Sequence, residues 1–390
     1  MRLRVQLAII GGGPSGLLLA QLCANAGIEC AVIERQSRDY VLKRIRAGVL
    51  EWGTVELLRS AGLGSRMDAQ GQVHEGFYLA AQNQTFRVDL KKAISKQVMV
   101  YGQTEVTKDL YDAHSKRGTS IYENVTDVAF HDLTTKPYVT FTQDKELWRV
   151  DADFIAGCDG FHGVSRHSIP ADVRREYEKV YPFGWLGILS PTKPVSHELI
   201  YANHPRGFAL ASMRNPQLSR YYIQVPLEDK VEAWSDAAFW DEFKRRLPAV
   251  AAESLVTDTP IEKSIAPLRS FVSEPMRWGK LFLCGDAAHI VPPTGAKGLN
   301  LAVSDVYYLS EALRQHFKEK SDAGLEAYSA KALARVWKAI RFSWWMTTLL
   351  HRFPVMCDFD QRVQESEIDY IAQSPAAQMM LAENYCGLPL

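Results

Sequence analysis

The stretch VQLAIIGGGPSG, residues 5–16, places a short apolar run directly before a glycine-rich turn, and the helix-forming LLLAQL of residues 17–22 follows. This order of strand, turn and helix is typical of a dinucleotide-binding βαβ unit. Gly11 permits the tight turn, Gly13 lets the backbone approach a pyrophosphate, and Gly16 lets the helix pack closely on the strand. The free N–H groups at the start of the helix then face the phosphates.

The residues after this helix complete the unit. Gly27 suits a left-handed helix end, and the apolar run 28–33 that follows predicts a second strand. Glu34 stands at the end of that strand, 18 residues after Gly16, where its carboxylate can accept the ribose hydroxyls of an adenosine. A glycine-rich turn without a ligand does not need this acid, so the combination favours a nucleotide site.

Composition excludes several classes of protein. The 390 residues predict two or three domains, and 45 basic against 45 acidic residues give no reason to expect nucleic acid or an anionic membrane as partner. The six cysteines show no metal-like spacing, which indicates reduced thiols and no metal site. Glycines interrupt the apolar N-terminal run, and the apolar cluster 342–350 is too short to span a bilayer. We therefore expect a cytoplasmic protein.

Two later apolar strands also end in an acid. Residues 151–155 lead into Cys158-Asp159-Gly160, and LFLCGDAAH at 281–289 contains Asp286, with a helix predicted from about residue 299. In doubly wound folds, ligands bind at this carboxyl edge of the sheet. An acid beside a helix N-terminus can accept a ribitol hydroxyl while the helix N–H groups polarise an electron-poor ring.

Residues 181–226 are rich in aromatic and β-branched residues and predict a separate, mainly antiparallel sheet. Ser212, Arg214 and Arg220 lie within it. An arginine on an apolar sheet needs an anion or solvent, so these residues indicate either a clamp for a ligand carboxylate or a structural ion pair. His74, taken alone, is more typical of a hydrogen-bonded structural histidine than of a catalytic one.

Three separated motifs resemble, in their order and spacing, those of the group A flavoprotein aromatic hydroxylases. They are GGGPSG with Glu34, the Cys-Asp-Gly at 158–160 and the Gly-Asp-Ala-Ala-His at 285–289. Several longer segments are similar to the members of this family that act on 4-hydroxybenzoate. Examples are RIRAGVLE at 44–51, HELIYANHPRGFAL at 197–210 and GDAAHIVPPTGAKGLNLA at 285–302.

The resemblance implies an α/β plus α+β fold. Residues 1–178 would form a GR2-type Rossmann-like FAD-binding domain, residues 179–268 a mainly antiparallel β-sheet substrate domain, and residues 269–390 the completion of the FAD site and a helical C-terminal interface region of a homodimer. The implied reaction converts 4-hydroxybenzoate, NAD(P)H and O2 to 3,4-dihydroxybenzoate through a flavin C4a-hydroperoxide.

The resemblance also assigns site residues. At the substrate it implies Ser212, Arg214 and Tyr222 for the carboxylate, Tyr201 and Tyr385 for the phenol, the Pro293 carbonyl beside the hydroxyl, and His74 at the outer end of a proton relay. For bound FAD it implies Gly11, Gly13, Ser15, Gly16, Glu34, Arg44, Gln103, Asp159, Arg220, Asp286, Lys297, Gly298, Leu299 and Asn300. For NADPH it implies Arg35, Gln36, Arg38, Tyr40, Arg46, His162 and Arg269.

Two positions depart from the pattern of the resembling family. Lys43 stands where we expect glycine, and Arg38 where we expect proline. The cations after Glu34 favour a 2′-phosphate and hence NADPH, but these departures leave use of NADH open. Two other readings also remain: a related flavin hydroxylase of another hydroxy- or aminobenzoate, and a flavin-based ligand sensor without turnover.

Overall fold

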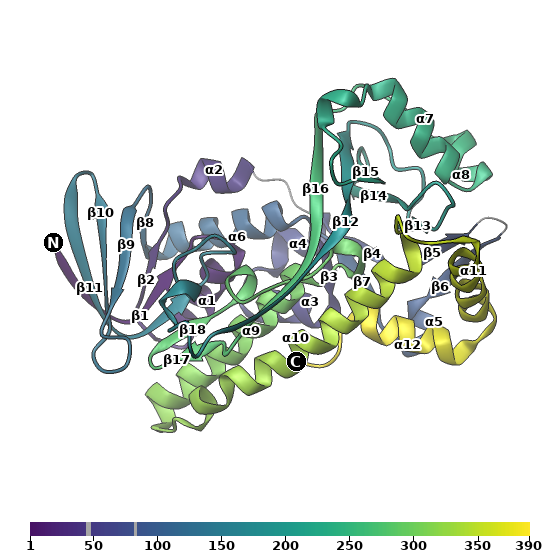
Figure 1. Cartoon of the computed structure of the whole chain (residues 1–390). Helices are drawn as coiled ribbons and strands as arrows, with labels where there is room; N and C mark the ends of the chain where they lie inside the picture. Colours follow the sequence, from purple (N-terminus) through teal and green to yellow (C-terminus); the bar gives the residue numbers. More distant parts are fainter. Residues whose placement is uncertain (44–47, 82–83) are drawn as a thin grey trace.

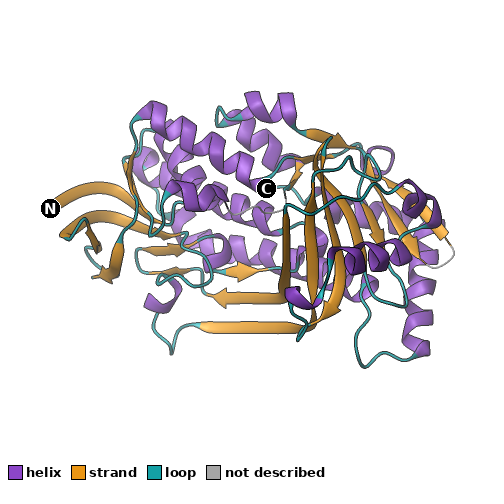
Figure 2. Ribbon diagram, turned by 90° about the horizontal axis from the view of Figure 1, so that it is seen from above, coloured by secondary structure: helices purple, strands orange, loops and turns teal. Residues whose placement is uncertain are grey.

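The computed structural model describes residues 1–43, 48–81 and 84–390, so Arg44 and Arg46 of the predicted nucleotide contacts lie outside the described residues. Two large sheets share the molecule, and helices flank both of them (Figures 1 and 2). This is the predicted mixture of an α/β part, a mainly antiparallel sheet and a helical C-terminal region.

The first sheet has the strand order β17-β18-β11-β1-β2-β8. Its central strands are parallel, and residues 7–10 of β1 are buried, as expected where helices cover both faces. Two antiparallel strands, β9 and β10, extend from β11. The strands are β1 (Arg2–Ile10), β2 (Cys30–Ile33), β8 (Ser120–Tyr122), β9 (Thr126–His131), β10 (Tyr138–Gln143), β11 (Glu146–Gly157), β17 (Arg277–Trp278) and β18 (Leu281–Leu283).

The helix that follows the glycine turn packs on two other helices beside the first sheet. Helix α1 (Pro14–Asn25) contacts α6 (Gln103–Arg117) and α9 (Gly298–Arg314). A Cβ on Gly16 would lie 2.0 Å from the Gly11 carbonyl oxygen, which explains why glycine is needed for this close approach. Gly27 has a φ of +69°, so the predicted left-handed conformation just beyond the helix is confirmed.

The second sheet has the order β19-β16-β12-β15-β14-β13-β5-β6 and is antiparallel except where β13 meets β5. The long strands β12 and β16 run from one part of the molecule into the other (Figure 1). The strands are β5 (Gly76–Ala81), β6 (Gln84–Asp89), β12 (Arg175–Ser190), β13 (Ile200–Ala202), β14 (Ala209–Asn215), β15 (Leu218–Pro226), β16 (Glu262–Glu274) and β19 (His289–Ile290).

The two faces of the second sheet are covered by different helices. Phe239 and Phe243 of α7 (Asp236–Arg246) pack on one face, beside α8 (Ala249–Ser254). The other face packs on α10 (Ala323–Leu350), α11 (Asp358–Gln373) and α12 (Pro375–Cys386), which place Tyr385 in the same apolar cluster as Tyr201. Because β5 and β6 come from the first 178 residues, we propose that the substrate domain is discontinuous in sequence.

Smaller elements join the two parts. A three-stranded sheet has the order β3 (Val49–Glu51), β7 (Val98–Val100) and β4 (Gln72–His74). Helix α3 (Trp52–Ser60) contacts β3 and β7, and α4 (Gly64–Gln70) packs on α3. Two more short helices pack elsewhere: α2 (Arg38–Lys43) contacts α6, and α5 (Leu90–Ile94) contacts α12. Single helical turns include η3 (Gly285–Ala287) and η4 (Pro293–Gly295). Among the helices of the described chain, we find no run of apolar residues long enough to cross a bilayer.

Candidate active site

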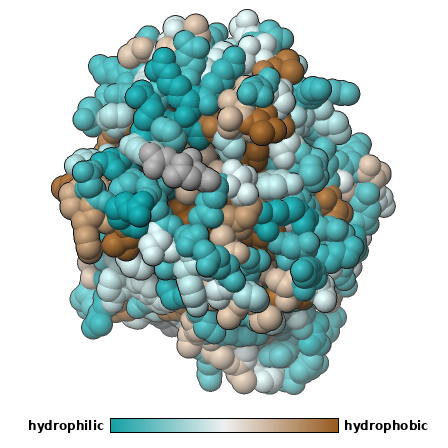
Figure 3. All heavy atoms as spheres, turned by 90° about the vertical axis from the view of Figure 1, so that its right-hand side faces the viewer, coloured by the Kyte–Doolittle hydropathy of each residue, from teal (hydrophilic) through white to brown (hydrophobic). Residues whose placement is uncertain are grey.

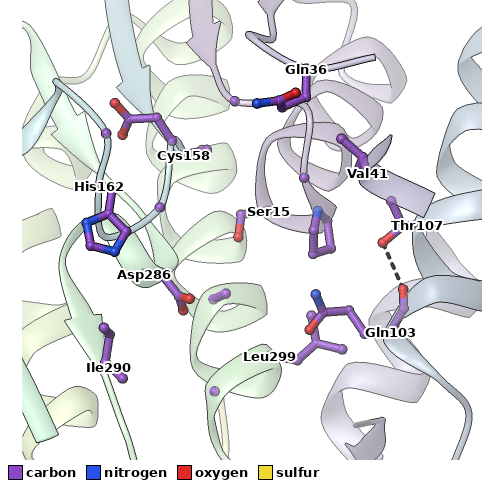
Figure 4. A pocket seen from close by; sticks show the side chains of 18 of the residues that line it. Ser15, Gln36, Val41, Gln103, Thr107, Cys158, His162, Asp286, Ile290 and Leu299 are labelled. Carbon is purple, nitrogen blue, oxygen red and sulfur yellow. Dashed lines mark hydrogen bonds between the residues drawn. The ribbon is translucent and has the colours of Figure 1, made fainter. Parts of the chain in front are cut away.

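One large cavity, of about 1120 Å³, collects residues from the carboxyl edge of the first sheet and from the second sheet (Figure 4). It brings together motifs that are far apart in sequence. Of the predicted FAD residues, its lining contains Gly11, Gly13, Ser15, Glu34, Gln103, Asp159, Arg220, Asp286, Lys297, Gly298 and Leu299. Of the other predicted residues, it contains Arg35, Gln36, Tyr40, His162, Tyr222, Arg269 and Pro293.

At one end of the cavity, the backbone holds Glu34 in place. One carboxylate oxygen accepts the Gly12 N–H at 2.5 Å and the other accepts the Gln36 N–H at 2.7 Å. A Cβ on Gly11 would lie 2.3 Å from the Cys158 carbonyl oxygen, whereas a Cβ on Gly13 would have no protein atom within 4 Å. Open space above Gly13 beside a fixed carboxylate is the geometry that a nucleotide with a pyrophosphate requires.

The middle of the cavity offers acceptors for hydroxyl groups. Asp159 Oδ2 accepts the Ser165 N–H at 2.9 Å, but its buried Oδ1 has no hydrogen-bond partner in the described part of the chain. Burial raises the pKa of this carboxyl. Asp286 is exposed and points into the cavity near Ser15 and His162 (Figure 4). These residues fit FAD, because a sugar or ribityl hydroxyl would satisfy the orphaned Asp159 oxygen.

Lys297 and Asn300, which the sequence assigned to FAD, also bind other parts of the protein. Lys297 Nζ lies 2.7 Å from Glu51 Oε1 and donates to the Tyr385 carbonyl at 2.9 Å. The Asn300 side chain binds the backbone of Val49 at 2.9 Å and, through its oxygen, the Glu51 N–H at 2.9 Å. Asn300 is absent from the cavity lining. Sequence reasoning missed Glu51, since only the tertiary structure brings β3 to these residues.

Two tyrosines that are 184 residues apart meet between β13 of the second sheet and helix α12, outside the cavity lining. The Tyr201 and Tyr385 hydroxyls are 3.0 Å apart, and both side chains are buried around Phe77. Burial raises the pKa of Tyr201 to about 12, while Tyr385 is bonded to it and has its pKa raised further by burial. The pair therefore stays protonated at neutral pH and can donate hydrogen bonds.

The arginines of the second sheet differ in their partners. Arg220 pairs with Glu262 at 3.1 Å, so it has a carboxylate of its own. Arg214 binds only the Met213 carbonyl at 3.1 Å and the Tyr222 hydroxyl at 3.4 Å, and it forms no ion pair with any acid that the structure describes. Its buried Nε has no partner in the same set of residues. Arg214 is half-buried, and a partly desolvated guanidinium without a carboxylate partner is suited to an anionic ligand.

The surroundings of Arg214 reflect this excess of positive charge. Burial lowers the pKa of Arg214 itself. Burial also acts to raise the pKa of Tyr222, but the Arg214 and Arg220 guanidinium groups outweigh it, and the net pKa lies below the ordinary value. Ser212 Oγ donates to the Arg220 carbonyl at 2.7 Å, which places its hydroxyl on the same strand pair. The site is suited to a carboxylate.

His74 is buried at the end of β4, away from the cavity lining. Neither ring nitrogen has a hydrogen-bond partner within residues 1–43, 48–81 and 84–390. Burial lowers the pKa of His74 to about 4, although the charge of Glu198 opposes this shift. The ring is therefore neutral at pH 7 and able to accept a proton, but the structure does not bond it to Tyr385.

The predicted nicotinamide residues fall into two groups. Arg35 and His162 are exposed at the cavity. Arg38, by contrast, pairs with Asp112 at 2.6 Å and is not part of the lining, and Arg269 pairs with Glu178 at 3.1 Å. No group of side chains suited to a metal occurs in the part of the chain that was described.

Comparisons with known proteins agree with this geometry. The model of the FAD binding domain family matches residues 4–343. The chain is 56% identical over 388 residues to a p-hydroxybenzoate hydroxylase from Acinetobacter baylyi, with coverage of 99% of this chain and 96% of the relative. It is 25% identical over 360 residues to 6-hydroxy-3-succinoylpyridine 3-monooxygenase from Pseudomonas putida, with coverage of 85% and 84%.

The fold is similar to a solved structure as well. The crystal structure of p-nitrophenol 4-monooxygenase PnpA from Pseudomonas putida DLL-E4 superposes with a TM-score of 0.84 at 18% identity, and the alignment covers 100% of both chains. This likeness shows the fold, and the family model and the 56% identical relative show the family. The chain belongs to the FAD binding domain family and, within it, to the flavoprotein hydroxylases that include the Acinetobacter relative, as the sequence motifs predicted.

Proposed function

We propose that this FAD-dependent enzyme hydroxylates 4-hydroxybenzoate at C3 to give 3,4-dihydroxybenzoate, with NAD(P)H and O2 as co-substrates. One observation carries the choice of substrate: Arg214 has no acid as partner among the described residues, while the Tyr201 and Tyr385 hydroxyls form a hydrogen-bonded pair at 3.0 Å. A carboxylate and a phenol at opposite ends of one ring would satisfy both features. The similarity to a p-hydroxybenzoate hydroxylase supports the same substrate.

At the carboxylate end, Arg214 would form the charge-assisted pair, and Ser212 and Tyr222 would add hydroxyl donors. Holding the carboxylate fixes the direction of the ring, so that the carbon beside the hydroxyl faces the oxidant. The Pro293 carbonyl is our proposal for the acceptor near the substrate hydroxyl. FAD, when bound and reduced by the nicotinamide, would activate O2 and so provide the electrophilic oxygen.

At the phenol end, the task of the protein is to favour the phenolate, because an electrophilic oxygen attacks an electron-rich ring. Tyr201 stays protonated at neutral pH, with a pKa of about 12, so its hydroxyl would donate to the phenolate oxygen. Tyr385 is bonded to Tyr201 and would pass the proton onward. His74 is our candidate for the outer end of this relay, and its pKa of about 4 makes the buried ring a weak base at neutral pH, so that it would relay a proton without retaining it.

FAD would extend from Glu34 at the ribose, past the Gly11–Gly13 turn at the pyrophosphate, to Asp159 and Asp286. Arg220 would act on the position of the flavin ring, together with Lys297 and the start of helix α9.

NADPH would bind at the open side of the cavity, in contact with Arg35, Gln36, Tyr40, His162 and Arg269. We propose Arg38 only as a minor contributor, because Asp112 already holds its guanidinium.

The activity is tested by NADPH oxidation with and without 4-hydroxybenzoate, followed by identification of the product. We expect strong stimulation and 3,4-dihydroxybenzoate. 4-Hydroxybenzamide, which lacks the negative charge, should bind at least about tenfold more weakly, because an ion-paired hydrogen bond contributes about 1.5–3 kcal/mol. Stimulation that yields only hydrogen peroxide would reject the proposed substrate, and equal binding of the amide would reject the role of Arg214.

Replacing Tyr201 by phenylalanine removes the phenol donor but keeps the ring. We expect Tyr201→Phe to retain FAD and to bind 4-hydroxybenzoate, while product formation falls about 10²-fold or more. Tyr181→Phe is the matched control, because Tyr181 is also buried, but its hydroxyl bonds to Ser270 and not to Tyr201 or Tyr385. Fully coupled turnover in the Tyr201 variant would refute the assignment.

We propose NADPH as the preferred nicotinamide, since Arg35 is an exposed cation at the cavity that can pair with a 2′-phosphate. The kcat/KM for NADPH should exceed that for NADH, and Arg35→Ala should reduce the ratio by roughly tenfold. Arg38→Ala is the control, and we expect a smaller change because its guanidinium pairs with Asp112. Equal kcat/KM values for both nucleotides in the unmodified enzyme would contradict the preference.

We also propose a homodimer that acts in the cytoplasm. Four apolar side chains are exposed just before and along α11: Val355 (91% exposed), Phe359 (74%), Val363 (52%) and Tyr370 (57%). Figure 3 faces this end of the molecule and shows hydrophobic patches among hydrophilic side chains. Such a stripe suits contact with a second copy. Free cysteines are consistent with a reducing compartment.

Sedimentation equilibrium tests the dimer. Phe359→Glu combined with Val363→Glu should shift the protein toward the monomer, because two charges would be buried in an apolar contact. Val250→Glu is the matched control, since Val250 is 81% exposed on α8, away from α11. A monomeric unmodified protein, or loss of the dimer in the Val250 variant alone, would contradict this contact.

A further inference from the structure

Asp305 of α9 and His289 of β19 form a buried ion pair that the proposed chemistry does not use. Their Oδ2 and Nε2 atoms are 2.6 Å apart, and both side chains are almost fully buried. Burial acts to lower the pKa of His289, but the charge of Asp305, with a further contribution from Asp286, raises it above the ordinary value. The raised pKa favours the protonated ring, whose Nε2 is placed to donate to Asp305 Oδ2.

The same oxygen of Asp305 also binds the backbone. Asp305 Oδ2 accepts the Gly285 N–H at 2.9 Å. Gly285 opens the turn η3 and His289 follows it, so one carboxylate oxygen ties both ends of the segment that carries Asp286. The other oxygen, Oδ1, is buried without a partner among the residues described. The carboxylate thus depends on these two contacts.

Gly285 is also the point where three cavity elements touch. It has a φ of +62°, and a Cβ there would lie 2.8 Å from Ser15 Oγ in the first glycine motif and 3.2 Å from Ala302 Cβ in α9. Helix α9 begins with Gly298 and Leu299, which line the cavity. A shift of the turn would therefore move Asp286 relative to both the pyrophosphate turn and the start of α9.

We propose that Asp305 and His289 are positioning residues for FAD: they fix the turn that presents Asp286 against the first glycine motif and the N-terminal turn of α9. Neither side chain lines the cavity, so both act through the turn and the helix. The proposal rests on the assignment of Asp286 to FAD, and Asp286→Ala tests that assignment separately.

The test measures the rate at which diluted holoenzyme releases FAD, from the rise in flavin fluorescence, together with the thermal unfolding temperature. His289→Leu leaves the Asp305 charge buried with a single N–H partner. We expect FAD release to accelerate about tenfold to a hundredfold, as for loss of one partner of a buried charged hydrogen bond. His289→Gln can restore a donor toward Asp305 and should recover most of the slow release.

Glu242→Gln is the matched control, because Glu242 is a buried acid paired with Arg206 and Arg246 under the second sheet, outside the cavity lining. It should lower the unfolding temperature without changing FAD release. Asp305→Asn, which keeps an acceptor for Gly285, provides a second variant and should release FAD faster than the unmodified enzyme.

Unchanged FAD release in both His289→Leu and Asp305→Asn would overturn the proposal. So would equal acceleration in Glu242→Gln, because the effect would then follow from general destabilisation. A normal product with 4-hydroxybenzoate in the unmodified enzyme is compatible with either result, so failure of this inference is distinct from failure of the proposed function.

Discussion

The parallel pairing of four strands is the constraint on which the rest of the site depends. Ile10 at the end of β1 lies opposite Ile33 of β2 and Gly157 of β11, and Gly157 lies opposite Leu283 of β18. Parallel strands have their carboxyl ends at the same edge, so the residues just beyond them converge. The glycine turn, Glu34, Asp159 and Asp286 therefore share one cavity although they are spread over most of the chain.

The second sheet contributes aromatic and cationic residues to the cavity. Strands β12 and β16 pair over most of their length and connect the two parts of the molecule (Figure 1). They bring Trp185 and the strand pair that carries Arg220 and Tyr222 to the same cavity as the glycine turn. A cofactor site and an apolar, antiparallel surface are thus joined by strands, which hold their geometry more rigidly than loops do.

The charged groups in and near the cavity differ in whether the protein itself balances them. Arg220, Arg38 and Lys297 have carboxylates within 3.1 Å, so their charges are balanced inside the protein. Arg214 and the buried Oδ1 of Asp159 have no such counterpart in the described chain. Because an unpaired polar group in a low dielectric is costly, these two groups are the strongest structural argument for a ligand carboxylate and a ligand hydroxyl.

The local spacing of glycines, apolar runs and acids was enough to predict the βαβ unit and the three acidic strand ends, and the resemblance of these motifs to known proteins indicated the flavin family. The partners of the cations followed only from the three-dimensional structure: Arg38 and Arg214 were both predicted to bind ligands, yet one pairs with Asp112 and the other has no acid among the described residues. It also decided the contacts of Tyr201 with Tyr385 and of Asp305 with His289. Such contacts depend on long-range packing, which no local pattern encodes.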